Sequence, residues 1–407
     1  MADVRMRGFK ERIEVAAFQE VVRARTAPRE SEEIALAEAG GRILGAPVVS
    51  QVNVPSFPRS AMDGYALRSE ETFGAGPYNP LTFKVIGEVT PGRVFAGEVG
   101  KGEAVRIMTG APIPPGADAV LMAEYTSEEG GVMTATDAVA PKKHVGRVGE
   151  DIQAGSQVFQ AGRCLRAQDL GMLASIGAAR VIVRKRPAVT LLITGNELVK
   201  PGEKPDGVKI VDSNSIMLKW LIERDGGTVA EILHLPDDRE VIREALLKAP
   251  GELLVTTGGT SVGVEDHAPT LVAEEGELLV HGVAMRPSAP TGFGLAAERP
   301  VFLLPGNPVS CLAAYDFFVA LAVRRMAGRD ERWPYRAVRF RLKDRIASQI
   351  GRLDYARVQL VDGEAKLLAT SGASILSSTT RADGFVVVDQ DSEGFAAGDT
   401  AEVWMYD

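Results

Sequence analysis

The pattern of hydrophobic and polar residues changes several times along the chain. From about residue 11 to residue 39, apolar residues recur with helical spacing among mixed charges, and glycines then interrupt the pattern. Between residues 52 and 151, short β-rich runs such as TFKVIGEV alternate with glycine and proline, and helical spacing returns at about 167–176. The pattern predicts a β-rich domain inserted into a discontinuous helical domain.

The pattern becomes regular after Pro187. The apolar runs AVTLLITG, TVAEILHL, ELLVTTGG, ELLVHGVAM and VFLLPGN alternate with helical segments, which is typical of a doubly wound α/β domain with a parallel sheet. After residue 335 the short runs VRFRLK, YARVQLV, GFVVVDQ and TAEVWMY predict a small β barrel or sandwich. The predicted domains are a discontinuous helical domain (8–50 and 152–180), an inserted β-rich domain (51–151), an α/β domain (181–330) and a C-terminal β-barrel domain (335–407).

Composition narrows the classes of partner. The chain has 46 Lys and Arg against 54 Asp and Glu, and its basic residues are dispersed, which argues against a nucleic-acid partner. Cys164 and Cys311 lie far apart without metal-ligand spacing. The charged N-terminus lacks a signal-peptide pattern, and the apolar stretch 309–323 is too short to cross a membrane. We therefore expect a cytoplasmic protein without a membrane partner.

Unusual residues follow the predicted strands of the α/β domain, and in open parallel sheets ligands bind at the carboxyl ends of strands. After the third predicted strand, the stretch TTGGTSVGVEDH contains three glycines that let backbone N–H groups point into one concavity, while its hydroxyls add donors. This combination indicates an oxyanion nest. The alternative is that these glycines only form a tight turn. The nest residues are Thr257, Gly258, Gly259, Thr260, Ser261 and Gly263.

Four carboxylates belong to the same set of strand ends: Glu197, Asp212, Asp237 and Asp266. Mg²⁺ is held in proteins by one or two carboxylates together with substrate phosphate, so the grouping favours a metal and phosphoryl site, with Glu197 and Asp266 as metal ligands. Taken singly, each carboxylate could be a solvated loop or capping residue, and Asp266 could be a helix N-cap.

Eight segments follow one another along the chain: SAMDGYAL at 60, VRIMTGAPIPPGADAV at 105, TGNEL at 194, VDSNS at 211, PDD at 236, TTGGTSVGVED at 256, LPGNPVSCL at 304 and RLDYAR at 352. In this order they resemble the MoeA family, which includes the gephyrin E domain. The resemblance implies a homodimer of four-domain subunits whose third domain has the MogA fold, with an active site between that domain and the partner subunit.

The implied reaction is a molybdopterin molybdenum transfer, in which adenylylated molybdopterin is cleaved with Mg²⁺, AMP is released and molybdate is inserted. Transient partners would be a MogA-like adenylyltransferase and acceptor molybdoenzymes. By matching motif positions, the resemblance assigns catalytic importance to Asp63, Thr109, Glu197, Asp237 and Asp266, and an anion contact to Arg357. Beyond the nest, the residues expected to bind the pterin nucleotide are Gly195, Asp212, Ser213, Asn214, Pro305, Gly306, Asn307 and Pro308.

The sequence departs from the family pattern at two positions of the presumed molybdate pocket. Ala289 stands where many members have a second lysine, and Ala373 stands where many have serine. We expect Arg286, Ser288 and Ser374 to compensate as oxyanion ligands. Two alternatives remain: a paralogue that inserts another oxyanion such as tungstate, or none, and a non-catalytic scaffold, as gephyrin also is.

Overall fold

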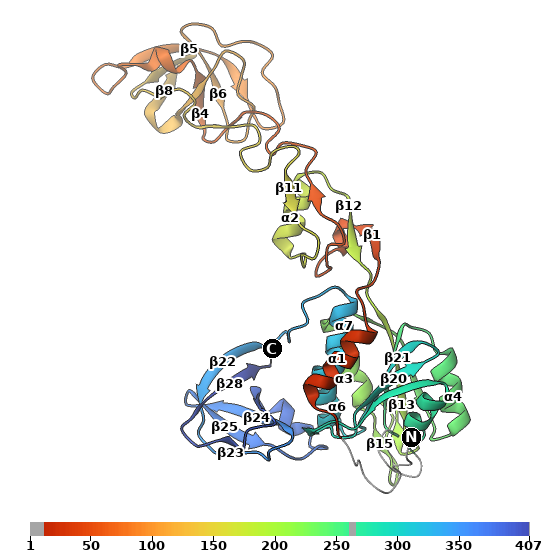
Figure 1. Ribbon diagram of the computed structural model, residues 1–407. Coiled ribbons are helices and arrows are strands. Elements are labelled where there is room, and N and C mark those ends of the chain that lie inside the picture. The colour runs from red at the N-terminus through yellow and green to blue at the C-terminus, as the bar shows by residue number, and fades with distance from the viewer. Residues whose placement is uncertain (1–11, 260–265, 407) are drawn as a thin grey trace. The chain divides into compact units, whose positions relative to one another are not determined.

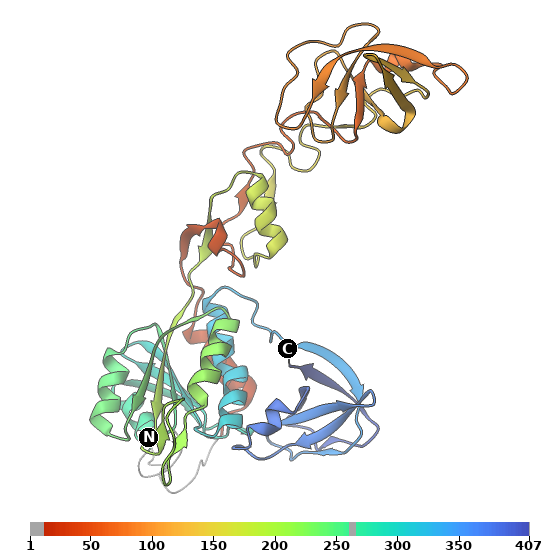
Figure 2. The same cartoon turned by 180° about the vertical axis from the view of Figure 1, so that it is seen from behind.

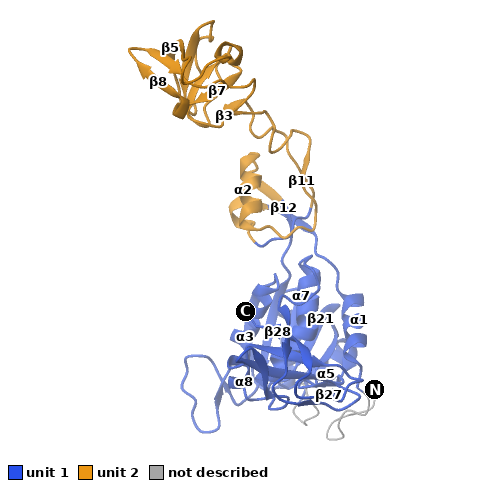
Figure 3. Ribbon diagram, turned by 90° about the vertical axis from the view of Figure 1, so that its left-hand side faces the viewer, with its two compact units in different colours: residues 1–33, 41–45, 182–407 blue, residues 34–40, 46–181 orange. Residues whose placement is uncertain are grey.

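The computed structural model describes residues 12–259 and 266–406. The chain forms two compact units, one of residues 1–33, 41–45 and 182–407 and the other of residues 34–40 and 46–181 (Figure 3). This division is coarser than the four predicted domains, whose boundaries stay a prediction except at residues 15–25, which are described below. None of the helices in the described part of the chain is long and apolar enough to cross a membrane.

The second unit contains the predicted β-rich domain, a six-stranded sheet with the order β7-β4-β6-β5-β9-β8. One apolar cluster contains Phe83 and Met133, and another contains Val105 and Ile107. The strands are β4 (Gly64–Leu67), β5 (Leu81–Val89), β6 (Glu103–Ile107), β7 (Ala119–Met122), β8 (Thr126–Glu129) and β9 (Val132–Ala135). This unit also contains two short ladders, β2 (Val48–Val49) with β11 (Gln157–Phe159) and β3 (Arg59–Ser60) with β10 (Val145–Gly146). Its other elements include the expected helix α2 (Ala167–Ser175) and the 3₁₀ turns η2 (Ser69–Thr72) and η3 (Ala123–Tyr125).

The helical prediction for residues 11–39 is wrong beyond Arg25. Helix α1 (Val15–Arg25) ends at Thr26, which is extended, and Pro28 disfavours a helical conformation at the residue before it. The chain continues as β1 (Ser31–Ala35), the 3₁₀ turn η1 (Leu36–Glu38) and, later, β12 (Arg180–Arg184). Phe18 and Val22 of α1 pack in the core of the α/β domain, so α1 does not belong to the helical domain predicted for 8–50 and 152–180.

The α/β domain contains a six-stranded sheet with the order β16-β13-β17-β21-β20-β18. The first four strands are parallel, as predicted, but β20 is antiparallel to both of its neighbours. The prediction of a parallel sheet therefore needs correction, because β20 and β21 form a hairpin that the sequence pattern did not reveal. The strands are β13 (Ala188–Thr194), β16 (Thr228–Leu235), β17 (Leu253–Thr257), β18 (Gly276–His281), β20 (Gly292–Ala296) and β21 (Arg299–Leu304).

Helices cover both faces of this sheet (Figures 1 and 2). In β13, Leu191 and Ile193 belong to one apolar cluster and Leu192 to the other, which explains why the strand has no polar alternation. The first cluster includes α1, α3 (Asn214–Arg224) and a continuous rod of α6 (Pro308–Ala314), the π-helix η4 (Tyr315–Val319) and α7 (Ala320–Met326). The second cluster includes α4 (Arg239–Lys248) and α5 (Ala268–Glu274).

The C-terminal sheet has the order β19-β24-β26-β28-β22, with β25 paired to β24. A bridge between Leu342 and Ala365 joins the end of β22 to β25, so the sheet curls into the predicted small barrel. Its strands are β19 (Met285–Arg286), β22 (Arg336–Arg341), β24 (Leu353–Val361), β25 (Glu364–Ala369), β26 (Gly384–Val388) and β28 (Thr400–Met405). The remaining elements of this unit are β14 (Leu198–Val199), β15 (Ile210–Val211), β23 (Ile346–Ala347), β27 (Gly394–Phe395) and α8 (Ser377–Thr380).

Candidate functional site

A pocket of about 520 Å³ lies at the carboxyl ends of β13, β17 and β21. This is the edge where ligands bind in open α/β sheets. Most residues predicted from the strand ends line it, as does Ser374 from the C-terminal domain. The predicted lining residues are Glu197, Asp212, Ser213, Asn214, Thr257, Gly258, Gly259, Asp266, Pro305, Gly306, Asn307, Pro308 and Ser374.

The backbone after β17 turns sharply at two glycines. Gly258 has φ +89° and Gly259 has φ +56°, and a Cβ at Gly258 would lie 2.2 Å from the carbonyl oxygen of Thr194. The Gly258 N–H donates to the carbonyl of Leu304 (3.4 Å), so it is not available to an anion. The tight-turn alternative therefore explains Gly258. The predicted nest residues Thr260, Ser261 and Gly263 lie outside the described residues.

Asn214, in the first turn of α3, fixes two strand ends. Its amide nitrogen donates to the hydroxyl of Thr257 (3.0 Å) and to the carbonyl of Gly306 (2.8 Å). Both donors are thus satisfied, while its buried Oδ1 has no hydrogen-bond partner within the described chain. A buried acceptor left unpaired costs about 1–3 kcal/mol, so a ligand N–H or O–H in the pocket would find a ready partner.

Asp212 has a structural role that its motif did not reveal. Its carboxylate is nearly buried, with Oδ1 accepting from the backbone N–H of Ser215 (3.1 Å) and Oδ2 lying 2.9 Å from Nε2 of His234. The nearby thiol of Cys311 is fully buried, and burial raises its pKa to about 12. Cys311 therefore stays protonated at neutral pH and is not a nucleophile.

Three of the four predicted carboxylates line the pocket: Asp212, whose oxygens are already engaged, and the two predicted metal ligands, Glu197 and Asp266. Helix α5 starts at Ala268 with His267 at the N-cap position, so Asp266 is not the cap residue. No group of three or more metal-ligating side chains occurs among residues 12–259 and 266–406. Two carboxylates nevertheless fit Mg²⁺, since this ion takes its other ligands from substrate phosphate and water.

Asp237 lies beside the pocket without lining it. Its Oδ2 accepts from the backbone N–H of Asn196 (2.8 Å), and its own N–H donates to Oδ1 of Asn196 (3.3 Å). This reciprocal pair ties the loop after β16 to the loop after β13. Gly195, also predicted, belongs to that second loop, and its φ of +151° is a conformation that residues with a side chain rarely adopt.

Asp63 and Thr109 are 46 residues apart but meet in the second unit. Oδ1 of Asp63 accepts both from the backbone N–H of Thr109 (2.7 Å) and from its hydroxyl (2.8 Å). These bonds, the backbone bond foremost, lower the pKa of Asp63 below its ordinary value. Asp63 therefore presents an exposed, ionised carboxylate whose orientation is fixed by Thr109.

The predicted oxyanion ligands Arg286 and Ser288 are engaged elsewhere. Arg286 forms an ion pair with Asp354, which is fully buried and also accepts from Arg352 (3.1 Å). The Ser288 hydroxyl donates to the carbonyl of Ser310 (2.7 Å). Neither side chain lines the pocket, so the expectation that they replace the lost lysine needs correction. The charge of Arg286 is paired with Asp354, and the hydroxyl proton of Ser288 is donated to Ser310.

Arg357 is in a different situation. The residue is fully buried, its Nη2 donates to the carbonyl of Ser371, and its Nε and Nη1 have no partner within the described residues. Burial lowers its pKa. The chain then reaches Ala373, whose carbonyl accepts from the N–H of Val309 (2.9 Å), and Ser374 at the pocket. Arg357 does not itself line the pocket, but its bond to Ser371 links it to the segment that leads to Ser374.

Sequence reasoning missed several residues of the site. The apolar wall of the pocket was not predicted. Leu198 and Val211 lie in the segments TGNEL and VDSNS but were not singled out, and Ile193 and Ile210 lie outside the eight segments. His234 was overlooked because it lies inside an apolar strand, β16, and only the folded chain places it beside Asp212.

Comparison with known proteins agrees with this geometry. Family models match residues 13–177 ("MoeA N-terminal region (domain I and II)"), 190–325 ("Probable molybdopterin binding domain") and 339–406 ("MoeA C-terminal region (domain IV)"). A molybdopterin molybdenumtransferase of Haemophilus influenzae is 32% identical over 92% of this chain and 94% of its own, and molybdopterin molybdenumtransferase 2 of Mycobacterium tuberculosis is 34% identical over 91% and 94%. The crystal structure of a molybdopterin biosynthesis moeA protein from Pyrococcus horikoshii superimposes with a TM-score of 0.80 at 34% identity, covering 97% of this chain and all of that one.

Proposed function

The chain belongs to the MoeA family and is a molybdopterin molybdenumtransferase. From that premise we propose that it takes adenylylated molybdopterin and molybdate as substrates and acts with Mg²⁺. Water cleaves the phosphoanhydride bond, so that AMP leaves with one phosphate and the pterin keeps the other. Molybdate exchanges one oxo ligand for the two dithiolene sulfurs, and this oxygen leaves as water with the two thiol protons, without a change of oxidation state. The observation that carries the proposal is one pocket that combines carboxylates, an unpaired amide oxygen and a wall from the C-terminal domain.

The pterin nucleotide would occupy the part of the pocket formed by the strand ends. Asn214 is held rigidly through both of its N–H groups, so its free Oδ1 can accept from a pterin N–H in a fixed direction. Ile210 and Val211 provide an apolar surface for a flat ring system. These residues bind and orient the substrate.

Glu197 and Asp266 are the groups that would hold Mg²⁺, together with phosphate oxygens of the substrate. When bound, this ion offsets the negative charge that develops as a phosphoanhydride is cleaved. Asp237 acts indirectly, because its bonds to Asn196 fix the loop that carries Glu197. We assign it a positioning role.

For the oxyanion we propose Arg357 and Ser374. The Arg357 guanidinium carries a positive charge and two donors, Nε and Nη1, without a partner among the described residues, and either can donate a charge-assisted hydrogen bond to an anion oxygen. The burial that leaves these donors unpaired would also strengthen their bonds to an anion. Arg357 therefore takes the role first expected of Arg286.

Reconstitution tests the proposal directly. The purified protein is incubated with adenylylated molybdopterin, Mg²⁺ and either molybdate or tungstate, and AMP release and metal retained on the pterin are measured. We expect AMP release that requires Mg²⁺ and rises with molybdate until it saturates. If AMP is not released, the proposed reaction is wrong.

The departures at Ala289 and Ala373 support one alternative, a paralogue that favours another oxyanion. Ala289 directly precedes Pro290, which lines the pocket, so the lost lysine concerns this wall. Equal or better saturation by tungstate would support that alternative. A scaffold without enzymatic activity would release no AMP with either anion.

We further propose that the chain is a homodimer in the cytoplasm, with transient contacts to a MogA-like adenylyltransferase and to acceptor molybdoenzymes. The support is the family membership and the position of Asp63 and Thr109 in a compact unit separate from the pocket. Analytical ultracentrifugation tests the assembly, and a fully active monomer at micromolar concentration would rule it out.

A further inference from the structure

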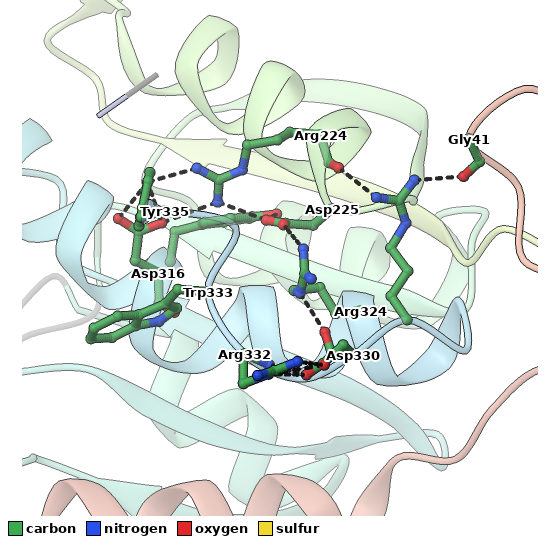
Figure 4. A network of polar contacts seen from close by, with 11 residues as sticks. Gly41, Arg224, Asp225, Asp316, Arg324, Asp330, Arg332, Trp333 and Tyr335 are labelled. Carbon is green, nitrogen blue, oxygen red and sulfur yellow. Dashed lines mark hydrogen bonds and ion pairs between the residues drawn. The ribbon is translucent and has the colours of Figure 1, made fainter. Parts of the chain in front are cut away.

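A network of buried charges joins η4 to the segment that leads into the C-terminal domain (Figure 4). Asp316 in η4 is 1% exposed, and both its carboxylate oxygens accept from the Tyr335 hydroxyl (3.0 and 3.1 Å). Arg224, the last residue of α3, donates to that hydroxyl (2.6 Å) and to Asp316 (3.2 Å). Asp225 is fully buried and accepts from Arg224 (2.8 Å) and Arg324 (2.9 Å). The network therefore gathers α3, η4, α7 and the interdomain segment at one point.

Aromatic packing continues the same contact into the C-terminal sheet. The indole N–H of Trp333 donates to the backbone carbonyl of Asp316 (2.8 Å). Its ring lies edge-on to Phe317 in η4 (4.7 Å between centroids), and to Phe385 (5.4 Å) and Trp404 (5.0 Å) in the C-terminal sheet. Trp333 is thus held between the π-helix and the C-terminal sheet.

A short path leads from this contact to the pocket. Strand β24 runs beside β26, which carries Phe385, and β24 also carries Arg357. Arg357 is bonded to the carbonyl of Ser371, three residues before Ser374 at the pocket. On the other side, α6 begins at the pocket with Pro308 and continues directly into η4. The place where the C-terminal sheet sits on η4 therefore sets the position of the pocket wall.

Burying the Asp316 carboxylate in this position costs free energy. Burial raises its pKa to about 6, although the charge of Arg224 and the Tyr335 bond oppose the shift and Asp225 adds to it. Tyr355 and Tyr406 also face it electrostatically. An apolar residue would pack here at lower cost. The Asp316 carboxylate accepts from the hydroxyl of Tyr335, which lies on the segment that leads into the C-terminal domain. A role of this contact in placing that domain would offset the cost of burying the charge.

We propose that Asp316 is a positioning residue for molybdenum transfer, which with Arg224 and Tyr335 holds the C-terminal domain so that its wall closes on the oxyanion. The inference rests on the proposed oxyanion site at Arg357 and Ser374. It predicts that weakening the contact between Asp316 and Tyr335 impairs the use of the oxyanion. The pterin nucleotide, which is held by the strand ends, should bind as before.

The test compares Tyr335→Phe and Asp316→Asn with wild type. Half-maximal AMP release should require about tenfold more molybdate in each variant, the loss expected when one charge-assisted bond is removed. The dissociation constant for the pterin nucleotide, measured without molybdate, should stay within about twofold. In wild type the half-saturating molybdate should rise as the pH falls from about 7.5 to 5.5, because Asp316 gains a proton, and Asp316→Asn should abolish that change.

Asp330→Asn is the matched control. Asp330 lies in the same segment, but its carboxylate pairs with Arg332 at the surface, so this variant should behave as wild type. If Asp316→Asn does not fold, Tyr335→Phe decides, because it removes only a hydroxyl. Unchanged half-saturation in the variants, or an equal loss of pterin binding, refutes the inference alone. A wild type without oxyanion dependence refutes the proposed oxyanion step and this inference with it.

Discussion

Replacing Arg357 with methionine should stabilise the protein and at the same time weaken its use of molybdate. Nε and Nη1 of this fully buried guanidinium have no hydrogen-bond partner in the described part of the chain, and each such group costs about 1–3 kcal/mol. Methionine fills a similar volume without that cost, although it leaves the Ser371 carbonyl unpaired, at about 1–3 kcal/mol. The free energy of unfolding should therefore rise by about 1–3 kcal/mol.

The effect on the substrate is the opposite. Two charge-assisted hydrogen bonds contribute about 3–6 kcal/mol, so the half-saturating molybdate concentration should rise by about two orders of magnitude or more. Denaturant unfolding followed by tryptophan fluorescence measures the first quantity, since Trp404 lies in the same domain as Arg357. AMP release as a function of molybdate measures the second.

Arg286→Met is the control for this experiment. It removes one partner of the fully buried Asp354, which keeps Arg352 and Ser348, so stability should fall by about 1–3 kcal/mol. The two arginine variants should thus change stability in opposite directions. The reasoning is refuted if Arg357→Met is destabilising, or if it uses molybdate as well as wild type.

Three further outcomes are expected. Glu197→Gln and Asp266→Asn should each weaken Mg²⁺-dependent AMP release while leaving the unfolding transition in place, and wild-type turnover in both variants would contradict their assignment as metal ligands. Thr109→Val should raise the pKa of Asp63 toward its ordinary value; the carboxyl titration followed by NMR should then move to higher pH, and the stability that the ionised form contributes should be lost at higher pH on acidification. Gly258→Ala should destabilise the protein by at least about 1–2 kcal/mol through its positive φ alone, and an unchanged melting temperature would show that the turn can rearrange.

Much of the architecture could be predicted because the chain obeys simple periodicities. Strands β13, β17 and β21 are mostly apolar because helices cover both faces of the sheet, and their ends could be located from the residues that follow them. The antiparallel strand β20 escaped prediction because its residues, GFGLA, carry two glycines and little β-propensity. Helix α1 was overextended, because the helical spacing was followed past Pro28, which disfavours a helical conformation at the residue before it.

Site residues could be predicted where their role follows from their place after a strand end. They could not be predicted where the role depends on which side chains surround them in the folded chain. Glu197 and Asp266 follow strand ends, so topology brings them into one pocket. The sequence does not show whether an arginine has donors left for an anion, because this depends on its neighbours in the folded chain. Arg286 is paired with the buried carboxylate of Asp354, whereas Arg357 donates to a single carbonyl.

The π-helix η4 also sets the helical phase of everything that follows it. A π turn accommodates one residue more than an α turn, so α7 is rotated by about 100° relative to an uninterrupted α-helix. Residues 320–323 are buried almost all round, and Arg324 meets Asp225 only in this phase. Deleting one residue within η4 would therefore move every later side chain of the rod to a new azimuth, a far larger disturbance than any single substitution there.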